Sequence, residues 1–416
     1  MPASAVPTAF PQRTGSDRMT DAPRKSLAPT RIATFAAIGA ATGAAHIGNN
    51  FTTYLVGGLI DRYDFTPVQM GAWSMAETLA YAAAMFLVAP RAQAMSARSL
   101  ASVATVLVVA AQAASAGFAL YLPLLAGRVA TGFGFGLMNS AVNLAAGRTD
   151  HPARAISAGI AVQTLLFAAV NIGLPMVGAS HGVAGMFTAL AGLSAALGLG
   201  TLLLPSGRAP APVHFAESPL RAPLGAYGWR VLAAMALFAF GSLAIWPFME
   251  RAAHAIGLPA TTFGRYQSLA TLLSALGNLA LVAVVARLPR VMPLALALGA
   301  CGVACALLTT VTDPRFFGAA LILYNVSWFI TYPLLLGLAY STDATGRLAV
   351  MTTGTWLLFQ SFGSLGAGFI AQGFGGYQPI GPLGLVACIF AAAAAWPLAT
   401  RFDRARINAA PLLETG

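Results

Sequence analysis

Two stretches of 53 residues without a charged side chain, residues 155–207 and 348–400, set the strongest limit on the fold of this chain. A helix crosses about 30 Å of hydrocarbon in about 20 residues, so each stretch can hold two membrane spans with a turn between them. Similar apolar runs fill most of the remaining sequence. The pattern predicts an all-α polytopic membrane protein.

Counting such runs predicts about twelve transmembrane helices. We place them near residues 33–59, 70–90, 100–120, 123–146, 155–178, 183–204, 230–250, 264–286, 293–311, 316–339, 348–372 and 381–399.

The composition supports this class and excludes others. Of 416 residues, 58% are hydrophobic and 8% are charged, values that soluble globular domains do not reach. The formal net charge of +11 comes from arginines in short clusters between apolar runs, not from one basic face, so the expected partner is the lipid bilayer and not nucleic acid. The only lysine, Lys25, is not part of a phosphate-binding loop. The three cysteines lie inside apolar runs, and the sequence indicates neither a metal site nor a cofactor.

Charged residues also reveal an internal repeat. Asp150, Arg154 and Arg208 correspond to Asp343, Arg347 and Arg401 with a constant offset of 193 residues. Each set reads Asp-x-x-x-Arg, followed by one of the uncharged stretches and a further Arg. The match predicts two six-helix halves related by a parallel pseudo-repeat.

The distribution of basic residues predicts the orientation. With both termini inside, the two tails and the even-numbered loops hold 18 of the 23 basic residues, which follows the positive-inside rule. We therefore expect an integral protein of a bacterial inner membrane with both termini in the cytoplasm. The predicted segments are a disordered tail (1–31), the first half (32–204), a proline-rich cytoplasmic linker (205–229), the second half (230–400) and a C-terminal tail (401–416).

The architecture and one motif carry a family resemblance. Residues 125–134 read Leu-Ala-Gly-Arg-Val-Ala-Thr-Gly-Phe-Gly, with Arg128 before a glycine-rich turn of the fourth predicted helix. The motif and the six-plus-six organisation resemble the major facilitator superfamily over roughly residues 30–402. The resemblance implies a secondary transporter and associates Arg128 with coupling, often to protons. Residues 90–98 lack the Asp and both Gly of the family's loop motif between helices 2 and 3, and only Pro175 and Gly178 match its antiporter motif.

Ionisable residues inside predicted spans are candidates for function because a charge in hydrocarbon is costly. Glu77 and Arg128 both lie about 7–9 Å from the outer end of their helices, in one layer. They could form a proton-coupling pair or a static ion pair, and Glu77 could instead extend toward water. His46 lies near mid-membrane, where it could bind substrate, carry a proton or make an interhelical hydrogen bond.

Polar and small residues share one face on two helices of the first half. Such a face either lines a cavity or packs closely on another helix. These residues are Arg128, Gly132, Gly136, Asn139 and Asn143 on the fourth helix, and Gly39, Gly43, His46 and Asn50, with Asn49 beside them, on the first.

Aromatic and polar residues mark the second half. The resemblance places helices 1, 4, 7 and 10 around a central cavity, so these residues are substrate candidates for a small organic solute with an apolar body and a polar end. The alternative is that the aromatic residues are interfacial anchors and that Glu250 lies near the outer boundary. The candidates are Asn325, Trp328 and Tyr332, then Trp246 and Glu250, then Trp356 and Gln360. Gln267, Ser274 and Asn278 share a face that we interpret as helix packing.

The matched loop charges, Asp150, Arg154, Asp343 and Arg347, are candidates for a cytoplasmic gate. The sequence as a whole predicts a monomeric, proton-coupled secondary transporter of a small organic solute that works by alternating access, with the direction of transport left open. Two alternatives remain: a membrane sensor or regulator on a carrier fold, and a membrane-embedded enzyme. No pair of nucleophile and base is visible, so the expectation is a non-enzyme.

Overall fold

The computed structural model describes residues 29–149, 152–206, 224–284, 288–343 and 347–413. Regular structure in these ranges is entirely helical. Seven of the helices are long and apolar enough to cross a membrane. The all-α polytopic fold is confirmed, and the count of twelve spans stays a prediction. The elements are α1 (Pro29–Tyr63), α2 (Pro67–Val88), η1 (Ala89–Ala94), α3 (Ala97–Gly117), α4 (Tyr121–Ala146), α5 (Pro152–Thr201), α6 (Ala226–Ala244), η2 (Trp246–Phe248), α7 (Met249–Ala255), α8 (Ala260–Val284), α9 (Val291–Thr310), α10 (Pro314–Thr342), α11 (Arg347–Phe374) and α12 (Ile380–Leu413).

Local sequence explains where several helices begin. The Thr66 side chain accepts a hydrogen bond from Gln69 N, and the Gln69 side chain accepts one from Thr66 N, which together form a capping box before α2. Asp313 caps α10 by accepting hydrogen bonds from the backbone of Arg315 and Phe316. Pro67 and Pro314 each occupy the first position of the helix that follows, where the missing N–H costs nothing.

Two elements contain a break. The backbone of α5 turns sharply at Gly182, which has a left-handed φ of 63°. Leu166 and Leu197, one on each side of this turn, both approach Gly43 of α1, so the two parts of α5 run back along each other. The predicted helix 230–250 is interrupted near Pro247 and consists of α6, η2 and α7.

The helices extend further than the apolar runs predicted. Helix α1 begins at Pro29 within the expected tail, and α12 continues to Leu413 through the expected C-terminal tail. Backbone hydrogen bonds inside a helix do not depend on lipid, so a helix can pass from the membrane into water. The extension of α12 is anchored because the Asp403 carboxylate accepts hydrogen bonds from the N–H groups of Arg290 and Val291, at the start of α9. The tail (1–28) and most of the linker (207–223) lie outside the described residues.

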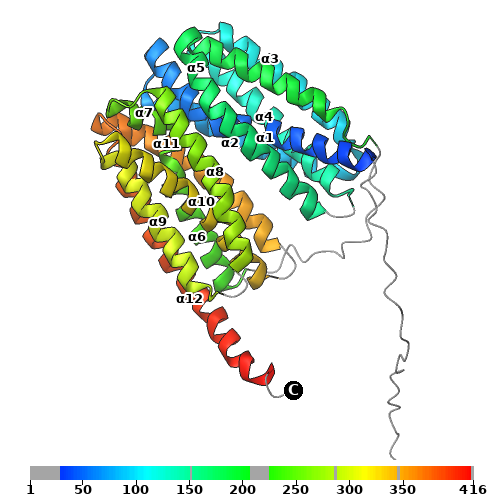
Figure 1. The fold of residues 1–416 in the computed structure, drawn as a ribbon, viewed down its shortest axis with the longest axis vertical. Coiled ribbons are helices and arrows are strands. Elements are labelled where there is room, and N and C mark those ends of the chain that lie inside the picture. Colours follow the sequence, from blue (N-terminus) through cyan, green and yellow to red (C-terminus); the bar gives the residue numbers. More distant parts are fainter. Residues whose placement is uncertain (1–28, 150–151, 207–223, 285–287, 344–346, 414–416) are drawn as a thin grey trace, which may run out of the picture.

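The helices form two bundles, α1–α5 and α6–α12 (Figure 1). We call the end where α5 finishes and α6 starts the linker end, and the opposite end the far end. The ribbons of the two bundles meet toward the far end and lean apart toward the linker end (Figure 1). Helix α2 packs on α11, and α5 packs on α8, across the boundary between the bundles.

The offset of 193 residues recurs in the backbone. Asp64 and Gly257, which follow α1 and α7, have φ values of 52° and 76°. Gly182 and Gly375 have φ values of 63° and 66°. In the described ranges, these four residues are the ones with a left-handed φ, and both pairs are separated by 193 positions. Turns at equivalent places in the two bundles therefore share a positive φ.

The same offset relates the closest crossings between the bundles. A Cβ atom on Gly71 of α2 would lie 2.6 Å from the carbonyl oxygen of Ser364 on α11. A Cβ atom on Gly264 of α8 would lie 2.1 Å from the carbonyl oxygen of Asn171 on α5. Gly264 follows Gly71, and Ser364 follows Asn171, by 193 residues. Only glycine allows the two helix backbones to come this close.

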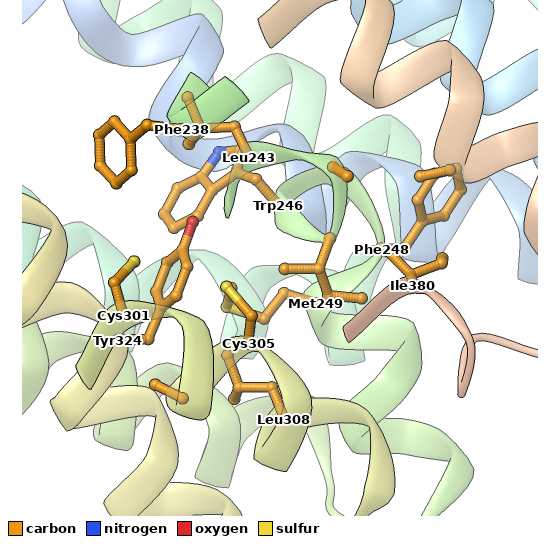
Figure 2. Close-up of a cluster of buried hydrophobic side chains, with 14 of the residues drawn as sticks. Phe238, Leu243, Trp246, Phe248, Met249, Cys301, Cys305, Leu308, Tyr324 and Ile380 are labelled. Carbon is orange, nitrogen blue, oxygen red and sulfur yellow. The ribbon is translucent and has the colours of Figure 1, made fainter. Parts of the chain in front are cut away.

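Figure 2 shows part of the core of the second bundle, where Trp246 of η2 meets α9 and α10. The Trp246 ring stacks on Tyr324, with centroids 6.5 Å apart, and the Tyr324 hydroxyl donates to Ser242 O at 2.8 Å. Cys301 and Cys305 lie beside Tyr324 as buried free thiols (Figure 2).

Candidate functional site

Glu77 and Arg128 form an ion pair in the interior of the first bundle. Arg128 Nη1 lies 2.6 Å from Glu77 Oε2, and each side chain is only 4% exposed. The sequence placed both residues in one layer, and the structure brings them into contact. A pair with so little exposure has lost nearly all of its hydration and depends on its immediate neighbours.

Three helices surround this pair. The Arg128 guanidinium lies over the Trp73 ring of α2, 3.8 Å from its centroid, and Nη2 donates a hydrogen bond to Thr52 Oγ1 on α1. Thr52 in turn donates to Gly48 O at 2.8 Å. A Cβ atom on Gly48 would lie about 2.5 Å from the Glu77 carboxylate, so α1 presses directly on the pair. Sequence reasoning missed Trp73, although it stands one helical turn before Glu77.

The polar face of α4 is largely a packing surface. Cβ atoms on Gly132 and Gly136 would lie 2.3 and 2.2 Å from backbone oxygens of α2. Asn139 donates to the sulfur of Met85 on α2 at 3.5 Å, and Asn143 is exposed. The two glycines fix how closely α2 and α4 approach, which in turn sets the separation of Glu77 and Arg128.

The corresponding face of α1 has mixed roles. Gly39 and Gly43 pack against side chains of α5. His46 Nδ1 lies 2.8 Å from Thr42 O of its own helix, and Asn50 Nδ2 donates to His46 O at 2.9 Å. The bond to Thr42 fixes Nδ1 of His46 as the donor and leaves Nε2 for another partner.

Asn49 joins the two bundles. Its backbone oxygen accepts a hydrogen bond from Trp246 Nε1 at 2.6 Å, and its side-chain oxygen accepts one from Gln360 Nε2 at 2.7 Å. Three of the candidate residues, one each from α1, η2 and α11, therefore meet at one point between the bundles.

Aromatic rings of the second bundle gather next to this point. We call Phe238, Trp328, Tyr332 and Trp356 the aromatic cluster. Trp328 stacks on Tyr332 with centroids 5.7 Å apart and an interplanar angle of 7°. Trp356 lies 6.2 Å from Trp328 and 5.3 Å from Tyr332. Phe238 of α6 also stacks on Trp328, with ring centroids 5.9 Å apart.

Asn325 does not join the aromatic cluster, although it shares a helical face with Trp328 in the sequence. It is 3% exposed and exchanges hydrogen bonds with Gln267 of α8 at 3.2 and 3.4 Å. Asn325 lies about one helical turn before Trp328 on α10, and at that position the side chain points toward α8. Gln267 has the helix-packing role that the sequence indicated.

Glu250 is buried, with 5% exposure, and lies toward the far end, where it borders a cavity. Its backbone N–H donates to Thr53 Oγ1 at 2.8 Å, and its carboxylate lies against Gly57 of α1. Beside it, Arg251 forms an ion pair with Asp61 at 2.6 Å. These contacts join α1 to α7 at the far end and border a cavity of about 860 Å³. The Asp61–Arg251 pair was missed because its partners are 190 residues apart.

A second group of contacts, deeper than the Asp61–Arg251 pair, joins α1 and α5 to α8. Tyr54 donates to Asn171 Oδ1 at 3.1 Å, and Asn171 donates to Thr271 Oγ1 at 3.3 Å. The Tyr54 ring also meets Phe263 edge-on at 5.6 Å. Together with the Asp61–Arg251 pair, these contacts hold the far end closed.

The gate candidates lie at the linker end. Arg154 is exposed on α5, and Asp343 accepts a hydrogen bond from Leu348 N at 3.0 Å at the start of α11. Arg347 is the first residue of α11. Asp150 lies outside the described residues.

Neither a family model nor a curated protein matches this sequence. Solved structures do match over nearly the whole chain. A bacterial homolog of the human lysosomal transporter Spinster, in an inward-facing and occupied conformation, is 14% identical with a TM-score of 0.72 over 90% of this chain and 97% of its own. A D-xylose-proton symporter is 13% identical with a TM-score of 0.67 over 88% and 97%. The nucleoside transporter NupG is 15% identical with a TM-score of 0.67 over 89% and 99%.

These matches establish the fold. The chain has the same fold as these transporters of known structure. At identities of 13–15%, the matches do not transfer a substrate.

Proposed function

We propose that this protein is a secondary transporter that moves a small organic solute across a bilayer by alternating access, coupled to protons. The observation that carries the proposal is the Glu77–Arg128 pair, buried where three helices of the first bundle meet. A carboxylate kept at this depth is costly, and proton transfer is a common reason for retaining one.

The arrangement of the bundles supports alternating access. Their contacts at the far end and their separation toward the linker end fit one of the two states that such a carrier visits. If the linker is cytoplasmic, as the basic residues predict, this state faces inward. The fold is similar to the Spinster homolog in its inward-facing conformation, which supports this assignment.

The coupling step follows from the contacts of the pair. Protonation of Glu77 removes its negative charge and with it the attraction that holds Arg128 Nη1. Arg128 keeps its bond to Thr52 on α1, so a change at Glu77 alters the balance between α1, α2 and α4. A solute that binds near Asn49, which links α1 to the second bundle, acts on the same helix.

The remaining assignments belong to this proposal. The protein acts as a monomer in a bacterial inner membrane with cytoplasmic termini, and the solute site includes Asn49, Gln360 and the aromatic cluster. His46 is a further coupling candidate, and the other cavity candidates are Asn50, Asn139, Asn143, Trp246 and Glu250. No step requires a metal or a cofactor.

Reconstitution in vesicles tests the function. Glu77→Gln imitates the protonated carboxyl, so we expect it to abolish pH-driven accumulation and preserve solute exchange between equal concentrations. Asp64→Asn is a matched control, because this exposed acid lies in a turn whose left-handed φ Asn also tolerates. A Glu77→Gln protein with normal pH dependence would show that Glu77 is structural and leave His46 or Glu250 as the proton site.

A further inference from the structure

Three hydrogen-bonding atoms in and beside the aromatic cluster have no partner among the described residues. They are the indole donors Trp328 Nε1 and Trp356 Nε1 and the acceptor Gln360 Oε1, all buried. A buried polar group without a partner costs about 1–3 kcal/mol, so native structures rarely leave three of them together. Groups of this kind indicate a place where a bound molecule completes the hydrogen bonds.

The three groups occupy one region. Gln360 lies one helical turn after Trp356 on α11, and Trp356 is 6.2 Å from Trp328 on α10. Gln360 is 3% exposed, and its Nε2 donates a hydrogen bond to Asn49. This bond holds the amide group, so the position of Gln360 Oε1 is fixed as well. Trp328, Tyr332 and Trp356 remain partly exposed, which leaves ring surface for another flat group to contact.

The charge at this region is balanced. The rings of the aromatic cluster carry no charge, and the Glu77–Arg128 ion pair lies in the other bundle. That pair is neutral as a unit. Trp328, Trp356 and Gln360 carry no charge, so the three atoms that lack partners favour an uncharged ligand.

We infer that the site between the bundles takes a flat, uncharged aromatic molecule bearing an amide or lactam, whose carbonyl accepts from the two indoles and whose N–H donates to Gln360. This inference rests on the proposed function and names the solute class of the same site. Aromatic stacking supplies the affinity for the ring, and the three polar atoms select the amide.

Calorimetric titration of the purified full-length protein with four compounds of matched size tests this class. Benzamide has the ring, the carbonyl and the N–H; benzoate adds a negative charge, benzylammonium a positive charge, and cyclohexanecarboxamide lacks the flat ring. We expect benzamide to bind at least about tenfold more tightly than each of the others. Equal or tighter binding of benzoate or benzylammonium, or no binding of benzamide to folded protein, would overturn the inference.

Substitutions then test the individual atoms. Trp328→Phe and Trp356→Phe keep a ring and remove the donor, so each should weaken benzamide binding by about tenfold, the equivalent of one hydrogen bond. Trp396→Phe is the control, because Trp396 is half-exposed on α12. Unchanged affinity in both cluster variants would refute the role of the indoles even if benzamide binds.

A pH-sensitive dye inside vesicles separates this inference from the proposed function. A protein that moves protons in response to another solute but does not bind benzamide contradicts the inference alone. A protein that binds benzamide but moves no protons in response to any solute contradicts the proposed function and leaves the binding class standing.

Discussion

Glu250 on α7 packs directly against Gly57 on α1, and the two residues occupy equivalent positions of the repeat, 193 residues apart. A Cβ atom at position 57 would lie 2.1 Å from Glu250 Oε2. Two equivalent positions touch where the pseudo-twofold axis passes between them. The axis therefore runs through a contact that has a glycine in one half and a buried carboxylate in the other.

Gly57→Ala should open the far end. The added methyl overlaps the Glu250 carboxylate and should cost the closed state about 1–3 kcal/mol. Spin labels at His181→Cys and Arg315→Cys, exposed far-end positions in different bundles, should report longer distances in this variant. The measurement uses a protein in which the three native cysteines are replaced by Ala.

Gly299→Ala is the control, because a Cβ atom there meets nothing within 4 Å. An unchanged distance distribution in Gly57→Ala would mean that Glu250 moves aside without affecting the contact between the bundles.

Arg128→Gln should lower stability by about 3–5 kcal/mol, because it leaves the buried Glu77 carboxylate without its partner. The double variant Glu77→Gln/Arg128→Gln removes both charges and should regain part of this loss. Thermal unfolding of purified protein measures both values. If the double variant is as unstable as Arg128→Gln alone, the stability depends on the stacking of Arg128 on Trp73 and not on the charge of Glu77.

Arg154→Ala and Arg347→Ala should each shift the protein toward the state that is open at the linker end. The matched spacing of these residues in the two halves motivates the prediction, and the effect should be under about 1 kcal/mol because such charges are screened by water. Labelling of cysteines placed at the linker end should become faster. Unchanged labelling in both variants would assign these charges to topology only.

Both termini should be cytoplasmic, because 18 of 23 basic residues then lie on the inner side. A reporter enzyme fused after Gly416 that is active only in the cytoplasm should be active, and one that needs the periplasm should be silent. The reverse pattern would invert the topology and make the observed state outward-facing.

Much of the fold could be predicted from the sequence because each span carries its own signal. Charge-free length locates the helices, and loop charges reveal the offset that later reappears in Asp64 and Gly257. Helix ends were less predictable: α12 continues beyond its apolar run to Leu413, and Asp403 in this extension bonds to the backbone at the start of α9. That contact joins residues 113 positions apart and leaves no local pattern.

The site was predicted in part. Depth along a helix can be counted, and this brought Glu77 and Arg128 together correctly. The neighbour that a helical face contacts cannot be predicted by counting residues. The sequence therefore left two alternatives for the α4 face with Gly132, lining a cavity or packing on another helix. Asn325 was placed with Trp328 for the same reason, because rotation about the helix axis decides whether a side chain meets α8 or the space between the bundles.

The geometry of the turns and crossings also says how related chains could be found. Gly182 and Gly375 need a left-handed backbone, and Gly71 and Gly264 need the absence of a Cβ atom, all at one fixed spacing. Each requirement applies to one residue and does not depend on which apolar residues fill the rest of the helix. A chain that keeps them in register can share this architecture while overall sequence comparison detects no similarity, so four glycines at this spacing serve as a search pattern.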